Sequence, residues 1–303
     1  MCLGKYRIIC YYLYIEFRGF QMSTDSVLSQ YYRQPEIYIT LPSGGQFYPE
    51  GTLEITATGE IPIYPMTAKD DIIVKTPDAL ISGEAIAQII ASCVPSIKDP
   101  WAMPASDIDY ILIAIRIASY GNEMDMDLTC INDECLHEFA MAVGLSDYVE
   151  KLGSVEFNNE QTTIQYGEIK VHIKPLSYLD TSLMQRRTFE EQQAVNVAAN
   201  AELTQEERES MYNDILRNMT DINMISITSG VQGIELPTGE IVVDKDEIVE
   251  FVNNSSVKLF RKITTCLEDI RAKTELPNIT AECPECKSMI DIPLIFDYAN
   301  FFA

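Results

Sequence analysis

The stretch AECPECKSMIDIPLIF, residues 281–296, places Cys283 and Cys286 two residues apart and then continues with alternating apolar residues. A close pair of cysteines is compatible with a redox dithiol, with half of a metal site or with two buried thiols. The choice depends on whether another part of the chain supplies a matching pair.

A second pair occurs in LTCINDECLHEF, residues 128–139, where four residues separate Cys130 from Cys135. Superimposing the second cysteine of each pair aligns the apolar residues that follow it, and superimposing the first cysteine aligns those that precede it. Phe139, Met141, Val143 and Leu145 then match Ile290, Ile292, Leu294 and Phe296, and upstream Met126 and Leu128 match Ile279 and Ala281. Each copy is therefore predicted to be a strand, a tight turn and a second strand with one apolar face.

Two such turns that face each other form the zinc-ribbon arrangement, in which four thiolates surround one zinc ion at about 2.3 Å. The sequence thus predicts a structural zinc site with the ligands Cys130, Cys135, Cys283 and Cys286. The two pairs lie far apart in the chain, so the ribbon must hold a large insertion between its halves. In this interpretation the ion clamps the two ends of the insertion together.

Other chemistry for the cysteines is less consistent with their surroundings. A redox dithiol lies at a helix N-terminus, which lowers the thiol pKa, whereas Cys286 is followed by the alternation of a strand. The zinc-deaminase signature requires His-x-Glu and a proline before its first cysteine, whereas Glu138 directly follows His137 and Pro284 lies inside the pair. Free thiols stay as the main alternative, and His137 fits either a donor to a thiolate or an ordinary strand histidine.

Composition limits the function. The 303 residues carry 22 Lys and Arg against 46 Asp and Glu, a net charge of −24. This charge repels nucleic-acid phosphates and acidic membrane surfaces, which disfavours both as partners. The chain has two histidines, no phosphate-binding glycine motif and no nucleophile beside an identifiable base, so nothing indicates an enzyme, a cofactor other than zinc or a small-molecule substrate. No cleavable secretory signal is recognisable, which favours a reducing cytoplasm.

The order of elements predicts an α+β fold: an N-terminal β-hairpin and helical block, and a split four-cysteine zinc ribbon with a large α/β insertion. Residues 1–36 are expected to be a poorly structured N-terminal segment, of which 1–21 are interpreted as an upstream extension of the reading frame. A first α+β domain is predicted for 37–125, the two halves of a zinc-ribbon-like β module for 126–145 and 279–303, and an inserted α+β domain for 146–278.

Local signals place individual elements. Two alternating runs around Thr58-Gly59 predict a β-hairpin within 52–66, and Ser106 is expected to cap a buried helix. Further predictions are capping boxes at Thr67 with Asp70 and at Thr204 with Glu207, a strand at 154–158, an apolar face of Met211, Ile215, Met219 and Ile222, a hairpin at 234–243, and a helix from Ser256 with Val257, Phe260, Ile263, Leu267 and Ile270 on its apolar face.

Four unusual strings occur in order: LPSGGQFYPEG (41–51), YPMTAKDD (64–71), PDALISGEAI (77–86) and VPSIKDPWAMPASDIDYILIAIRIASYG (94–121). They resemble the baseplate hub assembly proteins, or hub assembly chaperones, of contractile-tailed bacteriophages of the T-even type. The resemblance covers about residues 37–145, continues weakly through HIKPLSYLD (172–180) and extends to the paired-cysteine turns. The first string is compatible either with an exposed contact surface or with a connection that packs Phe47 and Tyr48 into the core.

The resemblance implies a non-enzymatic role in building the central hub of the tail baseplate, with other hub proteins as partners and the cytoplasm of the infected cell as the place of assembly. A structural component of the hub that is retained in the virion is the first alternative. A zinc-ribbon regulator that binds nucleic acid is the second. It would need a basic face, whereas the ribbon strands carry Glu138, Glu282 and Asp291.

Overall fold

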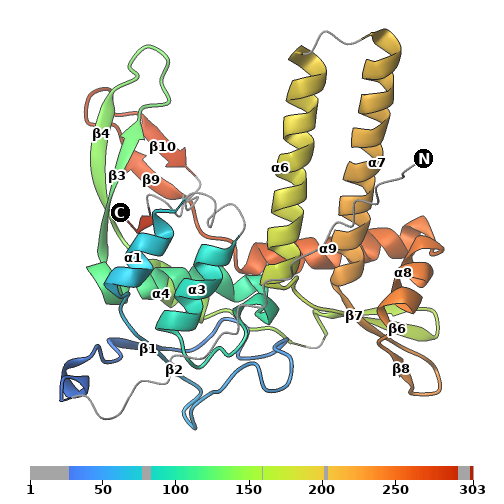
Figure 1. The fold of residues 1–303 in the computed structure, drawn as a ribbon, viewed down its shortest axis with the longest axis horizontal. Coiled ribbons are helices and arrows are strands. Elements are labelled where there is room, and N and C mark those ends of the chain that lie inside the picture. Colours follow the sequence, from blue (N-terminus) through green and yellow to red (C-terminus); the bar gives the residue numbers. More distant parts are fainter. Residues whose placement is uncertain (1–26, 77–82, 159, 201–203, 293–300, 303) are drawn as a thin grey trace, which may run out of the picture. The chain divides into compact units, whose positions relative to one another are not determined.

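A computed structural model describes residues 27–76, 83–158, 160–200, 204–292 and 301–302 of the chain (Figure 1). The chain separates into two compact units, Met1–Arg33 and Gln34–Ala303. The described part of the first unit contains the short 3-10 helix η1 (Ser29–Tyr31). The predicted upstream extension lies outside the described residues, as do Leu294 and Phe296 of the second cysteine segment.

The second unit combines helices with small antiparallel sheets, which confirms the predicted α+β class. The helices are α1 (Ala68–Val74), α3 (Glu84–Cys93), α4 (Ile108–Tyr120), α5 (Ser146–Gly153), α6 (Tyr178–Asn200), α7 (Gln205–Ser229), α8 (Lys245–Asn253) and α9 (Val257–Lys273), with the 3-10 turns η2 (Pro100–Ala102) and η3 (Ala105–Asp107). The paired strands are β1 (Ile37–Ile39) with β2 (Ile61–Ile63), β3 (Glu123–Thr129) with β4 (Glu138–Gly144), and β9 (Ile279–Glu282) with β10 (Met289–Ile292). One four-stranded sheet has the order β5 (Thr163–Tyr166), β6 (Ile169–Ile173), β7 (Val231–Glu235) and β8 (Ile241–Val242).

The first strand pair differs from the predicted hairpin. The predicted turn forms, with a hydrogen bond of 3.4 Å from the Thr56 N–H to the Glu60 carbonyl, but the strand after it pairs with β1 instead. Burial explains this choice, because Ile61 and Ile63 are 1% and 0% exposed in the core, whereas Ile55 before the turn is 43% exposed. The prediction is wrong because a turn signal does not specify the strand's partner.

Both predicted capping boxes are present. At the start of α1, the Thr67 side chain accepts a hydrogen bond from the Asp70 N–H, and the Asp70 carboxylate accepts one from the Thr67 N–H. Thr204 and Glu207 make the same reciprocal pair at the start of α7. These residues satisfy backbone donors that the first helical turn leaves unpaired.

Helix α4 lies at the centre of the apolar core that it forms with β1, β2 and α3. Most of its side chains from Ile108 to Arg116 are buried, as its continuous apolar sequence predicts. The prediction of Ser106 as its cap is wrong, because η3 precedes the helix directly and makes Asp107 the N-cap residue. Further along, the Arg116 Nε donates to the Phe301 carbonyl at 2.9 Å, so α4 also holds a much later part of the chain.

The segment between the cysteine pairs carries the four-stranded sheet, whose inner face packs against α8 and α9. The predicted hairpin at 234–243 is confirmed as β7 and β8, with Gly239 in the turn at a φ of 85°. The predicted strand at 154–158 is wrong, because this segment contributes side chains to the core but does not pair with a strand. Phe157 packs edge-on against Phe47, with 5.7 Å between the ring centroids.

On α9 the predicted and observed apolar faces overlap but differ in detail. Ser256 is the N-cap, as expected, and its hydroxyl accepts a hydrogen bond from the Leu259 N–H. Leu259 and Cys266 are buried, whereas Val257 is 66% exposed. Apolar residues at adjacent positions let this helix present either of two neighbouring faces, and periodicity alone does not choose between them.

Helices α6 and α7 run side by side as an antiparallel hairpin (Figure 1). The predicted apolar face of α7 is confirmed: Ile215 and Ile222 are buried, and Met211 and Met219 are half-buried. Many other apolar side chains of this hairpin are exposed, among them Phe189, Val197 and Leu216. The hairpin therefore has a narrow apolar contact and a largely solvated surface.

Most of the buried apolar side chains of the described residues belong to three clusters. The N-terminal core joins β1, β2, α3 and α4 to Phe301 and Phe302. The insertion core joins the four-stranded sheet to α8 and α9. The third cluster is small and lies between the two cysteine turns; its buried members are Leu128, Cys130, Ala281, Cys283 and Ile290. The predicted division into 37–125, 126–145 with 279–303, and 146–278 stays a prediction.

Candidate metal centre

The four predicted ligands lie at the ends of two short strand pairs, called here the knuckle module (residues 123–144 and 279–292). In the first pair Leu128 lies opposite Phe139. In the second, Ala281 lies opposite Ile290. These are the pairs that superimposing the two cysteine motifs aligns, so the module repeats the same register twice. The apolar faces of the two pairs contact each other in the third cluster.

The two cysteine turns also share their backbone geometry. The Cys130 N–H donates to the His137 carbonyl and the Cys283 N–H to the Ser288 carbonyl, both at 2.9 Å. In each turn the residue after the second cysteine has a left-handed backbone, with a φ of 47° at Leu136 and 62° at Lys287. Two turns 148 residues apart in the chain thus present their thiols in the same way.

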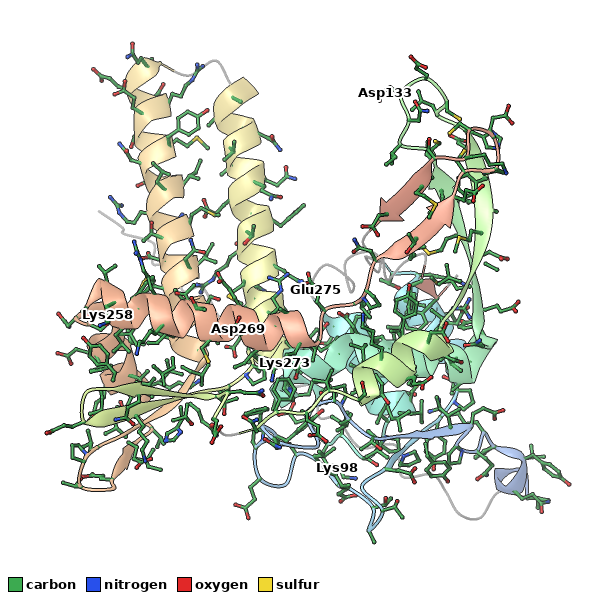
Figure 2. All side chains as sticks on the ribbon, turned by 180° about the vertical axis from the view of Figure 1, so that it is seen from behind. Lys98, Asp133, Lys258, Asp269, Lys273 and Glu275 are labelled. Carbon is green, nitrogen blue, oxygen red and sulfur yellow. The ribbon has the colours of Figure 1, made fainter. Side chains whose placement is uncertain are left out.

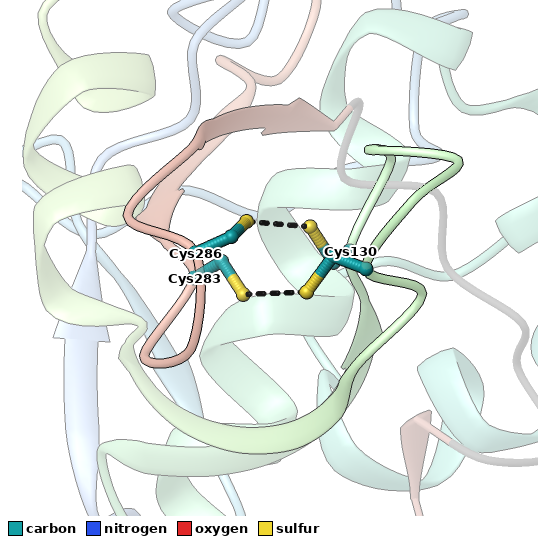
Figure 3. A group of neighbouring side chains, drawn as sticks. Cys130, Cys283 and Cys286 are labelled. Carbon is teal, nitrogen blue, oxygen red and sulfur yellow. Dashed lines mark hydrogen bonds between the residues drawn. The ribbon is translucent and has the colours of Figure 1, made fainter.

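The four sulfur atoms face one another at the centre of the module (Figure 3). Cys130 Sγ lies 3.5 Å from Cys286 Sγ, and Cys135 Sγ lies 3.9 Å from Cys283 Sγ. All four lie within 4.8 Å of one another. A disulfide would require about 2.05 Å, whereas a tetrahedral ion with bonds of 2.3 Å would separate its sulfur ligands by about 3.8 Å. The spacing therefore fits one four-coordinate ion.

The thiols are wholly or partly shielded from solvent and lie close to groups that donate hydrogen bonds to sulfur. The hydroxyl of Ser288, at 3.2 Å, and its backbone N–H both favour a thiolate at Cys286 and lower the pKa of that thiol to about 6. The backbone N–H of Asn132 favours a thiolate at Cys130, but burial and the neighbouring thiols outweigh it and raise the pKa to about 12. A proton therefore leaves readily from Cys286, and a second thiolate at Cys130 is disfavoured. A divalent cation among the sulfurs would reverse that effect.

This arrangement fits a closed structural site better than a reactive one. Four thiolates complete a tetrahedral shell and leave no open position for a substrate or water. Both short sulfur–sulfur distances run between the turns, and Cys286 leads into β10 instead of a helix, so the feature that activates a redox dithiol is not built here. The ring of His137, the residue before β4, stacks on Phe139, with 6.3 Å between the centroids, and the backbone N–H of His137 favours a thiolate at Cys135.

Comparison with known families assigns the chain. A family model described as T4 bacteriophage base plate protein matches residues 34–303. The chain belongs to this family. The match covers both cysteine turns and the whole second unit, Gln34–Ala303. No curated protein and no solved structure matched the chain.

Within this baseplate chain, the described residues contain no second group of three or more His, Cys, Asp or Glu side chains that is placed to share an ion. None of the helices described has the length and the apolar character needed to cross a membrane. The four cysteines are thus the strongest candidate site in the described part of the baseplate protein.

A buried carboxylate network was missed in the sequence. Asp107 is 0% exposed, and its carboxylate accepts hydrogen bonds from the Ser43 N–H (2.9 Å), the Ser43 hydroxyl (2.6 Å) and the Tyr48 hydroxyl (3.1 Å). Burial raises its pKa to about 6, although the donors from Ser43 and Tyr48 lower it. The sequence offered one indication of this network, because Ser43, Tyr48 and Asp107 all lie in strings that carry the family resemblance.

The hydrogen bonds to Asp107 bear on whether the loop at 41–51 is an exposed surface or packs into the core. Tyr48 reaches Asp107, and Phe47 packs on Phe157, so both aromatic side chains contribute to the interior and are half-buried. Of the two interpretations that the sequence allowed, packing into the core is the one that these contacts support. The loop therefore connects the N-terminal core to the insertion core in this baseplate family member.

Proposed function

We propose that this baseplate protein is an assembly factor, a chaperone or scaffold on which the central hub of the tail baseplate is formed. The observation that carries the proposal is the family match over residues 34–303, combined with the strings that resemble hub assembly proteins. Its partners are other hub proteins of the phage, and its place of action is the cytoplasm of the infected cell.

In this proposal the role is non-enzymatic, and Cys130, Cys135, Cys283 and Cys286 bind a structural zinc ion. The support is the closed tetrahedral spacing of the sulfurs, which lie within 4.8 Å of one another. A net charge of −24 argues against nucleic acid and acidic membranes as partners, because both carry the same sign of charge.

A second candidate function is a structural component of the hub that stays in the mature virion. The description of the family as a base plate protein favours it. The two candidates differ in where the protein is found after assembly, since an assembly factor is released and a component is retained.

Mass spectrometry of purified virions tests the choice. An assembly factor is expected to be absent from mature particles, while deletion of its gene arrests hub formation. Stoichiometric recovery of the protein from purified baseplates would contradict the assembly factor and support the retained component. Complementation of the deletion with the intact chain controls for effects on neighbouring genes.

A further inference from the structure

The knuckle module has an unusually acidic surface. It contains nine Asp or Glu residues and a single Lys, Lys287, a net charge of −8. All nine acidic residues are exposed: Glu123, Asp125, Asp127, Asp133, Glu134, Glu138, Glu282, Glu285 and Asp291. Figure 2 shows Asp133 at the outer end of the β3–β4 pair, in the turn that carries the first two cysteines. The field at this turn is therefore strongly negative.

Two apolar side chains are exposed within the same acidic turn. Ile131 follows Cys130 and is 63% exposed, and Leu136 follows Cys135 and is 59% exposed. Neither belongs to the small cluster beneath the cysteines. The backbone of Leu136 is held within the turn, because its N–H donates to the Asn132 carbonyl at 3.0 Å.

Leu136 occupies an unfavourable backbone position. Its φ of 47° lies in the left-handed region, which glycine adopts readily and a leucine does not. The other turn adopts the same geometry with Lys287 at a φ of 62°, so presentation of the thiols does not require an apolar residue there. Neither packing nor metal geometry explains a leucine that is both strained and exposed.

We propose that the Cys130–Cys135 turn docks a segment of a partner protein that presents an apolar side chain flanked by Lys or Arg residues. The apolar side chain would cover Ile131 and Leu136, and the basic residues would pair with Asp133 and Glu134 between them in the chain. This deepens the proposed function, on which it rests, by naming the surface and the chemistry through which a baseplate partner is recognised.

Charge selects this occupant over others. A second copy of the chain would bring a module of −8 against a module of −8, and like charges at an interface are unfavourable. A nucleic acid would meet the same repulsion. A basic and apolar segment is attracted by the acidic turn and gains the burial of two exposed side chains.

Photocrosslinking in infected cells tests the site. A p-benzoylphenylalanine residue replaces Leu136 in the full chain, and the control replaces Leu216, which is 66% exposed on α7. The expected result is a crosslink from position 136, but not from 216, to a baseplate protein within a segment that has an apolar residue next to Lys or Arg. A crosslink to a second copy, to nucleic acid or to a segment without basic residues, or no crosslink from position 136, would overturn the proposal.

Matched glycine variants measure the contribution of the leucine. Leu136→Gly removes the side chain at a backbone position that suits glycine, and Lys287→Gly makes the same change in the other turn. Fluorescence anisotropy with a synthetic peptide of the crosslinked segment should show binding at least tenfold weaker for Leu136→Gly and unchanged or tighter for Lys287→Gly. Equal binding by Leu136→Gly and wild type would contradict the docking role.

Charge reversal examines the second component of recognition. The double variant Asp133→Lys Glu134→Lys should weaken the same peptide at least tenfold and reduce the salt dependence of its binding. Equal zinc content in all variants shows that the module is intact. Recovery of the chain from mature virions, together with a crosslink from position 136 in those particles, would refute the assembly proposal and still support the docking site. Arrest of hub formation on deletion, together with no crosslink from position 136, would refute only the docking site.

Discussion

The knuckle module and the N-terminal core achieve order in different ways. The N-terminal core surrounds α4 with apolar side chains from β1, β2 and α3. The knuckle module contributes Met124, Val143 and Ile279 to that core, but the cluster between its cysteine turns has five buried side chains, two of them cysteines, and the module has a net charge of −8. An apolar cluster of this size contributes little, and small domains of this kind usually depend on a metal or a disulfide.

Because one region has a large apolar core and the other a small cluster with four thiols, the two regions should respond to different perturbations. The N-terminal core should depend on packing and be indifferent to chelators. The cysteine turns of the knuckle module should depend on their four thiolates and respond much less to changes in α3 and α4. Each experiment below tests one side of this contrast.

The largest effect is expected from Cys283→Ser Cys286→Ser. Loss of two thiolates abolishes the ion site, and structural zinc sites contribute on the order of 10 kcal/mol of apparent binding free energy. Elemental analysis should find one zinc per wild-type chain and none in the variant, and hydrogen exchange should show loss of protection in β3, β4, β9 and β10 but not in α4. Full metal content in the variant would refute the four-thiolate site. Cys266→Ser, outside the cluster, is the matched control and should keep the metal.

A second change reverses the contrast. Phe302 is 1% exposed within the N-terminal core, so Phe302→Ala should lower the free energy of unfolding by about 3–5 kcal/mol. Phe189→Ala, at a site 47% exposed on α6, should change it by less than about 0.5 kcal/mol. Urea unfolding measures both, and the zinc content should stay the same. A loss of metal in Phe302→Ala would show that the two regions are coupled.

The two regions should also respond to pH in opposite directions. Burial raises the pKa of Asp107 from its ordinary value of 3.8 to about 6, so the folded state binds the proton more tightly and the N-terminal core loses stability as pH rises. Linkage gives a decrease of about 1 kcal/mol from pH 5 to pH 7. The knuckle module should instead lose metal as pH falls, because protons compete for the thiolates.

Asp107→Asn checks the assignment of that pH response. The hydroxyls of Ser43 and Tyr48 can rotate to accept from the amide, so the network persists without a titratable group. Urea unfolding between pH 5 and pH 7 should show a flatter profile for the variant than for the wild type. An unchanged slope would assign the pH dependence to another group.

The smallest effect is expected in a third region, the α6–α7 hairpin. Thr204→Ala removes one side of the capping box at α7 and should cost about 0.5–1 kcal/mol. Hydrogen exchange should detect faster opening of α7 alone. Faster exchange in the knuckle module as well would mean that the hairpin and the module unfold together.

Local patterns explain which features could be predicted from the sequence. The knuckle module was predictable because each turn and its strands lie within about twenty residues and the pattern occurs twice. The capping boxes at Thr67 and Thr204 were predictable for the same reason, since both partners are three residues apart.

Contacts between distant residues account for what was missed. The pairing of β1 with β2 depends on the burial of Ile61 and Ile63 against helices that follow later in the chain. The hydrogen bonds of Asp107 join residues 64 positions apart, and no periodicity connects an aspartate to a serine at that distance. Pattern recognition finds elements, but tertiary packing decides which of them meet.

The bond from Arg116 to the Phe301 carbonyl has a consequence for how the protein is made. Helix α4 leaves the ribosome about 180 residues before Phe302, a delay on the order of 10 to 40 seconds at ordinary rates of bacterial synthesis. During that interval the N-terminal core lacks its last two aromatic side chains, and the first cysteine turn lacks its partner. Completion of both regions therefore waits for the same late segment, so a prematurely terminated chain would be left open at its core and at its metal site together.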